Sequence, residues 1–281
     1  MASSRRTQPK SSGGILPPTT KTRRLEANAT RLNKRRLEAN ATTENQMPDT
    51  IHKTRTMTPI PFQEFDENGE VRCYENGILP HWRQDHCTYF VTIRQNDALP
   101  IAVAIEIKHE RKLWLAHQNI DVDTPNWKQQ LKDLPPNEIR TYERMVGKLV
   151  NEKLDAGLGS CALRNPEAAK LIAETLEFFH GTRVWVGDYI VMPNHIHVLM
   201  RPMEGFELED ILFSIKSYSA NQINRLVGAE GQFWQRESYD HIVRDAEQLE
   251  AFQHYIRLNP VKANLPATSF IHRPANYAPA P

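Results

Sequence analysis

The sequence predicts an α+β fold in which one sheet, antiparallel at least in part, carries helices on a face. Short runs rich in aromatic and β-branched residues, typical of strands, are interleaved with longer amphipathic runs that end at glycine or proline. Two predicted strands, at 182–192 and 195–202, are separated only by Pro193 and Asn194. So short a connection favours a tight hairpin and therefore antiparallel pairing. Strands and helices in this order favour a layer of sheet covered by helices.

The folded region is expected to begin near Pro80 and to open with a strand. Residues 87–94, CTYFVTIR, have the aromatic and β-branched composition of a strand. In the next run, 99–116, the isoleucine spacing suits either one helix face or an alternating strand. We interpret it as a helix, because its charged KHERK stretch fits a solvated turn. Residues 124–136 are polar and bounded by prolines, which predicts a connection.

The next two helices carry clear terminal signals. The first covers 137–157 and is expected to end at Gly157. The second covers 165–181, with Asn165 as the N-cap and Pro166 at the first helical position. A glycine that follows a helix and an N-cap that precedes one are local signals, so both helices are predicted from their ends as well as from their composition.

The remaining elements are a helix at 207–228, a short extended segment at 233–244 and a last helix at 245–260. The last helix has Asp245 as its N-cap, and Pro260 is expected to stop it. The apolar face of the helix at 207–228 is formed by Leu208, Ile211, Leu212, Ile215, Ile223 and Leu226.

The first 60 residues differ in composition from the rest of the chain. They contain twelve Lys and Arg against four Asp and Glu, a net charge of +8, whereas the whole chain carries +1. They are rich in polar residues and proline and poor in aromatic residues, which predicts a disordered basic arm. The octet RRLEANAT occurs at 23–30 and again at 35–42, too short a repeat for a solenoid unit. A basic arm suits a polyanionic partner, although a solvated tail without a partner is an equal alternative.

Cysteine use and hydropathy limit the class of protein. The three cysteines, Cys73, Cys87 and Cys161, are widely spaced and include no CxxC pair, so we expect neither a disulfide framework nor a thiolate zinc site. The chain has no apolar run long enough for a membrane span, and its first residues lack the apolar core of a signal peptide. These features predict a cytoplasmic protein that does not enter the membrane.

His195 and His197 stand one residue apart within an apolar, strand-like run. Strand side chains alternate between the two faces, so both imidazoles point the same way while Ile196 points to the other face. Two imidazoles on one face make half of a metal site, although buried histidines that are merely hydrogen-bonded remain the alternative. We see no further Asp or His well placed to complete a closed zinc site, which makes Mg²⁺ or Mn²⁺ the better prediction.

Tyr255 and Asn259 share one face of the last helix because they are four residues apart. An amide oxygen can bind a hard cation, and a phenol can act as a nucleophile. If this face packs on the strand of His195 and His197, the group suits phosphodiester transesterification through a phosphotyrosine. A tyrosine that simply packs on the sheet is the alternative, and the spacing leaves Tyr218, on the helix at 207–228, open as well.

Two blocks together resemble a known family. They are VMPNHIHVLM at 191–200 and FWQRESYDHIVRDAEQLEAFQHYIRLNPVKANL at 233–265. Their combination resembles the single-tyrosine HUH transposases and is most similar to the REP-associated tyrosine transposases. The resemblance covers about 80–266. It implies a ferredoxin-like HUH domain with a central antiparallel sheet. Outside that domain we place the basic arm at 1–60, a linker at 61–79 and a Pro/Ala-rich tail at 267–281, and within it a helical insertion around 95–165.

The resemblance also implies the chemistry. His195 and His197 match the metal pair of the family, Asn259 matches its coordinating amide, and Tyr255 matches its nucleophile in preference to Tyr218. The implied reaction is Mg²⁺- or Mn²⁺-dependent cleavage and strand transfer of single-stranded or hairpin DNA through a 5′-phosphotyrosine, by a monomer or homodimer. Side chains that suit DNA contact are Trp234, Arg236, His241 and Arg244. Residues 61–281 carry a net negative charge, so a local basic groove or the arm is expected to hold the DNA.

Two other functions are compatible with the residues. A recognition-only protein would keep the fold and the hairpin binding but would have lost turnover, which the intact His195, His197, Tyr255 and Asn259 argue against. An unrelated metal-dependent hydrolase could use the histidine pair, but it would need additional Asp or His ligands.

Overall fold

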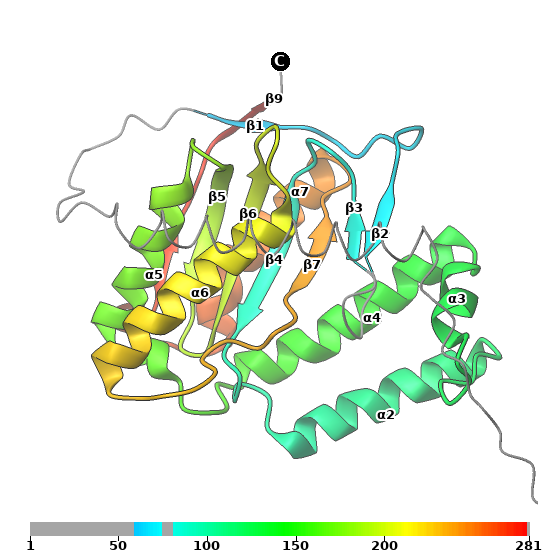
Figure 1. Cartoon of the computed structure of the whole chain (residues 1–281), viewed down its shortest axis with the longest axis horizontal. Helices are drawn as coiled ribbons and strands as arrows, with labels where there is room; N and C mark the ends of the chain where they lie inside the picture. Colours follow the sequence, from blue (N-terminus) through cyan, green and yellow to red (C-terminus); the bar gives the residue numbers. More distant parts are fainter. Residues whose placement is uncertain (1–58, 75–80, 280–281) are drawn as a thin grey trace, which may run out of the picture. The chain divides into compact units, whose positions relative to one another are not determined.

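The computed structural model of the chain describes residues 59–74 and 81–279. All but the last two residues of the predicted basic arm, including its repeat, lie outside this range. Figure 1 shows a central sheet with helices on both faces and a further group of helices beside it. Within this range no helix is long and apolar enough to cross a membrane.

The centre of the fold is a five-stranded sheet in the order β7-β4-β6-β5-β8. Every neighbouring pair is antiparallel, and β5 and β6 form the predicted hairpin. The predicted α+β class is therefore confirmed. The strands are β4 (Tyr89–Arg94), β5 (Val184–Val191), β6 (His195–Pro202), β7 (Tyr239–Ile242) and β8 (Ile271–Arg273). The edge strand β8 comes from the segment that the sequence placed in a Pro/Ala-rich tail.

The strands are connected as two successive strand–helix–strand units. In the first unit, α5 (Pro166–Phe179) lies between β4 and β5. In the second unit, which follows the β5–β6 hairpin, α6 (Leu208–Val227) lies between β6 and β7. This β-α-β-β-α-β order, with β4 between β7 and β6, is that of a ferredoxin-like unit. Helix α7 (Ala246–Lys262) follows β7 and precedes β8.

The two faces of the sheet bury different helices because strand side chains alternate. Helices α5 and α6 pack on one face, where Val91 and Ile196 belong to the main apolar cluster. Helix α7 packs on the other face, where Phe90 and Leu199 join its Leu249 and Ile256. The face under α7 is also the face to which His195 and His197 belong by alternation along β6.

The chain between β4 and α5 forms three helices with their own apolar cluster. They are α2 (Ile101–His117), α3 (Trp127–Lys132) and α4 (Pro136–Asp155). The helical interpretation of 99–116 is therefore correct. The predicted polar connection at 124–136 is wrong in part, because it contains α3, which buries Leu131 in this cluster. A single buried leucine in six residues gives too weak a periodic signal for a sequence-based assignment.

Both predicted N-caps are present. Asn165 accepts a hydrogen bond from the Glu167 amide at 2.9 Å, and Asp245 accepts one from the Gln248 amide at 2.7 Å. The predicted end of α7 at Pro260 is wrong, because the helix continues to Lys262. Pro260 is buried and its carbonyl accepts a bond from Leu265 at 2.9 Å. Tertiary packing thus holds a turn that proline would weaken in isolation.

Short strands and turns complete the described part. Strand β1 (Ile60–Phe62) pairs in parallel with β9 (Tyr277–Pro279), and β2 (Arg72–Tyr74) pairs antiparallel with β3 (His81–Arg83). Single turns of 3-10 helix are η1 (Ala162–Arg164) and η2 (Ala267–Ser269).

Candidate active site

His195 and His197 open strand β6 and point to the same face of the sheet as Leu199, the face that α7 covers. Both are fully buried. Their Nε2 atoms face each other at 3.0 Å. Ile196 and Val198 point to the opposite face and belong to the main core. The alternation predicted from the sequence therefore holds.

A second hydrogen bond orients each ring through its Nδ1 atom. His195 Nδ1 lies 2.7 Å from Asn194 Oδ1, and the Asn194 amide nitrogen donates to the Leu158 carbonyl. The amide oxygen of Asn194 is thus an acceptor, so His195 carries its proton on Nδ1 and its Nε2 offers a lone pair. His197 Nδ1 lies 2.9 Å from the Thr92 hydroxyl, whose oxygen can accept a hydrogen bond in the same way.

Burial keeps both imidazoles neutral. It lowers the pKa of His195 to about 3 and places the pKa of His197 well below its ordinary value, with the charge of His195 adding to the second effect. Neutral imidazole is the form that binds metal ions.

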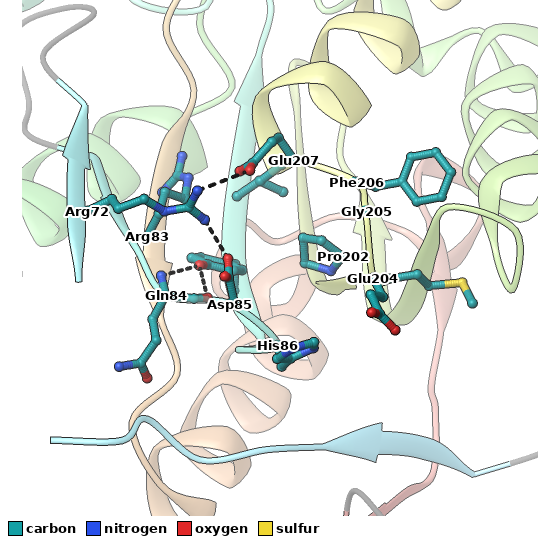
Figure 2. A pocket seen from close by; sticks show the side chains of 13 residues that line it. Arg72, Arg83, Gln84, Asp85, His86, Pro202, Glu204, Gly205, Phe206 and Glu207 are labelled. Carbon is teal, nitrogen blue, oxygen red and sulfur yellow. Dashed lines mark hydrogen bonds and ion pairs between the residues drawn. The ribbon is translucent and has the colours of Figure 1, made fainter. Parts of the chain in front are cut away.

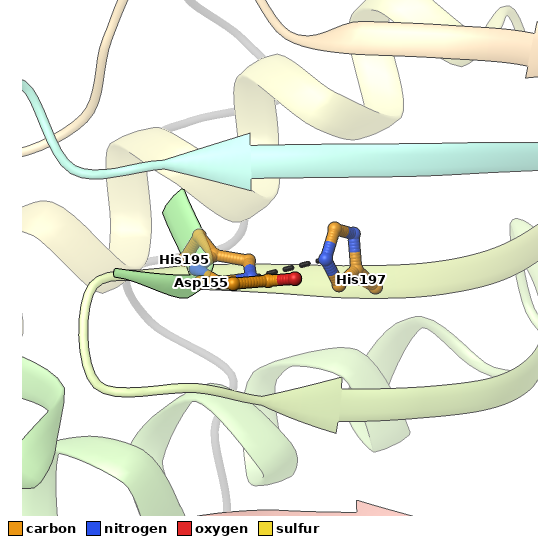
Figure 3. A group of neighbouring side chains, drawn as sticks. All are labelled: Asp155, His195 and His197. Carbon is orange, nitrogen blue, oxygen red and sulfur yellow. Dashed lines mark hydrogen bonds between the residues drawn. The ribbon is translucent and has the colours of Figure 1, made fainter. Parts of the chain in front are cut away.

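Asp155 brings a carboxylate to the same place from the last residue of α4. Ligand atoms of Asp155, His195 and His197 all lie within 4.8 Å of one another. Figure 3 shows the carboxylate beside the two rings. The sequence-based statement that no additional Asp or His is well placed is therefore wrong. Forty residues separate Asp155 from His195, and an acid before the end of a helix carries no local signal that would single it out.

The face of α7 that carries both Tyr255 and Asn259 packs on this group. The Tyr255 hydroxyl lies 3.5 Å from His197 Nε2. Asn259 is fully buried and donates a hydrogen bond of 3.1 Å from Nδ2 to Asp155 Oδ1. Its Oδ1 is buried and has no partner among the described residues. A buried acceptor without a partner is costly unless something binds it.

The Tyr255 ring is held on three sides. It lies edge-on to Phe90 and to His197, with ring centroids 5.9 Å and 5.1 Å away, and Lys262 Nζ lies 5.2 Å from its centre. Burial, and then the charge of Asp155, raise the pKa of Tyr255 well above its ordinary value. The phenol is therefore protonated in the absence of an added positive charge.

These residues fit a divalent cation. Two neutral imidazoles, a carboxylate and an unpartnered amide oxygen form a mixed nitrogen and oxygen donor set. Two ligand atoms that are each about 2.1 Å from one ion lie about 3 Å apart at neighbouring corners of an octahedron. The separation of the two Nε2 atoms, 3.0 Å, agrees with that geometry.

Tyr218 lies elsewhere. It is on α6, which packs on the opposite face of the sheet from α7. The alternative nucleophile that the spacing left open is thus not brought to the histidines.

The four side chains predicted to contact DNA have different environments. Trp234 does not fit that role, because it is 4 % exposed in the main core and donates from Nε1 to Ser219 at 2.9 Å. Arg236 is exposed. Arg244 is half-buried, with its guanidinium 5.1 Å from the ring centre of Phe65, and His241 is half-buried, 3.8 Å from Glu143.

A cavity of about 340 Å³ lies at the opposite end of β4 and β6. It is lined around the start of β4 and the residues that follow β6, whereas His195 pairs with Arg94 at the other end of β4. Figure 2 shows Arg72 between Asp85 and Glu207, to which it is paired. This cavity is therefore separate from the histidine group.

Part of the chain is similar to known proteins. A family model described as "Transposase IS200 like" matches residues 166–259, which include His195, His197, Tyr255 and Asn259. One solved structure that resembles the chain is described as the REP-associated tyrosine transposase bound to a REP hairpin. It is 14% identical with a TM-score of 0.33, and the match covers 66% of this chain and 73% of that chain. No curated protein matches the chain. The family match therefore runs from the start of α5 to Asn259 and spans the part of the chain that carries both histidines and the tyrosine.

Proposed function

We propose that the protein cleaves single-stranded DNA at hairpin repeats and transfers the strand through a 5′-phosphotyrosine on Tyr255. The observation that carries this proposal is the Tyr255 hydroxyl, 3.5 Å from His197 Nε2 within a buried group of two histidines, Asp155 and Asn259. A nucleophile next to a cation site is the arrangement that phosphoryl transfer requires.

In the cleavage step one phosphorus–oxygen bond forms and one breaks. The Tyr255 oxygen forms a bond to phosphorus while the bond from phosphorus to the 3′ oxygen breaks. The phenolic proton leaves to solvent, and the departing 3′ oxygen takes up one proton to become a hydroxyl. One phosphodiester is exchanged for another, so neither ATP nor water is consumed. The 3′ hydroxyl of another end can then attack the phosphotyrosine and release Tyr255.

His195, His197 and Asn259, together with Asp155, would hold Mg²⁺ or Mn²⁺. When bound, the cation would polarise the phosphate and favour the ionised phenol, which burial otherwise disfavours. Asn194 and Thr92 fix the two rings, and the sheet and α7 keep the group away from bulk water. Lys262, beside the Tyr255 ring, adds positive charge where the phosphate must lie.

In this proposal the transposase unit spans 80–266, with α2–α4 as an insertion, and the substrate is hairpin DNA of the REP type. The sequence blocks that resemble the REP-associated transposases support that substrate, and the protein acts as a monomer or homodimer. Exposed Arg236 precedes β7 and half-buried Arg244 follows it, and both are cationic groups for the DNA backbone.

One observation favours a second function. Asp155 supplies the third ligand that a metal-dependent hydrolase built on the histidine pair would need. Such an enzyme would use water as the nucleophile and would leave Tyr255 without a chemical role. The two functions therefore differ in whether the product is covalently attached to the protein.

A cleavage assay separates these functions. The full chain is incubated with end-labelled single-stranded hairpins from the flanks of its gene, with Mg²⁺ or Mn²⁺, and the products are separated on a denaturing gel. We expect a metal-dependent protein–DNA adduct that is lost in Tyr255→Phe and in His195→Ala. Tyr218→Phe is the matched control and is expected to form the adduct as the wild type does.

Each other outcome overturns the proposal. Shortened DNA without an adduct, still formed by Tyr255→Phe, would establish the hydrolase. Hairpin binding without any product would leave a recognition-only protein. An adduct that survives Tyr255→Phe and disappears in Tyr218→Phe would place the nucleophile on α6.

A further inference from the structure

A second cavity, of about 540 Å³, lies at the end of the sheet where β6 begins. Its walls come from the residues after β4, the residues before α5 and the end of α6 with the loop that follows it. Five of its side chains are amides, and Phe233 adds an aromatic ring; the amides are Gln95, Asn96, Asn165, Asn224 and Gln232. Neither the family match nor the proposed chemistry gives this cavity a role.

Gln95 connects the cavity to the catalytic histidines. It follows Arg94, the β4 residue that pairs with His195. The backbone N–H of Gln95 donates to the backbone carbonyl of Asn194 at 2.9 Å, and the side-chain oxygen of Asn194 accepts from His195 at 2.7 Å. Two hydrogen bonds therefore separate the wall of the cavity from a proposed metal ligand. A strand whose phosphate lies at the histidines can place a neighbouring nucleotide here.

The charge of the lining selects against phosphate. Among the described residues that form it there is no Lys or Arg, whereas Asp97 and Glu230 carry carboxylates. A phosphate would be repelled, whereas an uncharged ring with hydrogen-bonding edges would not. Amide side chains pair with the edges of bases, and an aromatic ring stacks on their faces.

Gln95 also supplies a donor that needs a partner. Its side chain is 2 % exposed, and its Oε1 accepts from the Ala162 amide at 3.3 Å, which fixes the orientation of the amide. Its Nε2 is buried and has no partner in the part of the chain that the structure describes. Gln95 lines the cavity, so an acceptor bound there would be the partner that this N–H group lacks.

We propose that this cavity binds one unpaired nucleobase of the DNA strand next to the cleaved phosphate, with a base acceptor on Gln95 Nε2. The inference rests on the proposed function and adds a specificity pocket to it. A bound base fixes which phosphate reaches Tyr255, so the cavity selects the position of cleavage as well as adding affinity.

The test combines a blocked cavity with a scan of the DNA. Ala229 is an exposed residue of the lining, and Ala229→Trp fills the cavity without changing a buried residue. Leu226→Trp is the matched control, because Leu226, near the end of α6, is exposed, unlike the other residues of the predicted apolar face, and does not line the cavity. Fluorescein-labelled hairpins carry one abasic site at each single-stranded position in turn, and fluorescence anisotropy gives Kd while the denaturing gel gives the adduct.

For the wild type and Leu226→Trp we expect one abasic position to weaken binding by tenfold or more, an effect on the order of one lost base–aromatic stack. Ala229→Trp should bind the intact hairpin as weakly as the wild type binds the abasic one, with no further loss on abasic DNA. The pocket is excluded if no position matters, or if Ala229→Trp raises Kd for intact and abasic hairpins by the same factor. Adduct formation that is equal on every abasic hairpin would overturn the pocket alone, whereas an absent adduct with base-sensitive binding would overturn the strand transfer alone.

Discussion

The amide of Asn259 donates a hydrogen bond of 3.1 Å to the carboxylate of Asp155, across 104 residues of sequence. The bond links α7 to the end of α4. It engages the amide nitrogen of Asn259 and leaves the buried amide oxygen without a partner among the described residues. Asp155 therefore does two things at once. It orients the amide, and it adds a carboxylate to the two histidines.

Asp155→Asn is expected to weaken Mn²⁺ binding by about 10- to 100-fold, because it removes one negative charge from the ligand group. The midpoint of a calorimetric titration with Mn²⁺ measures this effect. Glu152→Gln, an exposed residue on the same helix, is the control and should leave the midpoint unchanged. An unchanged midpoint in Asp155→Asn would show that Asp155 only positions Asn259.

Thr92→Val is expected to lower Mn²⁺ affinity by about tenfold while the fold is kept, because it removes the hydroxyl that orients His197 through Nδ1. Thr88→Val provides the control. Thr88 is also buried close to β4, but its hydroxyl has no partner in the described range, so its loss should be neutral or stabilising. Calorimetric titration with Mn²⁺ measures the affinity of each variant. Equal affinities for the two variants would contradict the orienting role of Thr92.

Gly147→Ala should destabilise the wild type more than it destabilises Tyr239→Phe. A Cβ atom at Gly147 would lie 2.7 Å from the Tyr239 hydroxyl and 3.1 Å from its ring carbon Cζ, where α4 packs on β7. Overpacking costs about 1–3 kcal/mol, whereas alanine in a helix gains about 1 kcal/mol over glycine. Tyr239→Phe removes the shorter of the two contacts, so we expect a smaller loss of stability in that background. Urea unfolding of the four proteins measures both losses, and equal losses in the two backgrounds would refute the contact.

Stability is expected to depend on pH through His81. Burial alone would lower the pKa of His81, but hydrogen bonds to Asp240 and Glu237 raise it to about 9. The stabilisation is fully present below pH 6.5, the ordinary pKa, and is lost as the pH rises through about 9. The difference in unfolding free energy between the wild type and His81→Gln should therefore shrink between pH 6 and 9.5. His254→Gln, an exposed histidine, is the control, and a constant difference for His81→Gln would contradict the ion pair.

The sequence by itself determined the elements with local signals. The period of apolar residues placed α4, α5 and α6, caps at Asn165 and Asp245 fixed two helix starts, and the short Pro193–Asn194 link fixed the hairpin. Alternation along β6 put His195 and His197 on one face, and helical spacing put Tyr255 and Asn259 on one face. These are properties of neighbouring residues, so they need no knowledge of the fold.

Only the tertiary structure decided what depends on residues distant in the chain. It brought Asp155 to the histidines, moved Trp234 into the core, carried α7 beyond Pro260 and paired the C-terminal β8 with β5. Burial decides each of these outcomes. An acid, an indole or a proline has the same local preferences wherever it occurs, and the packing of other elements around it determines whether it binds, fills a core or continues a helix.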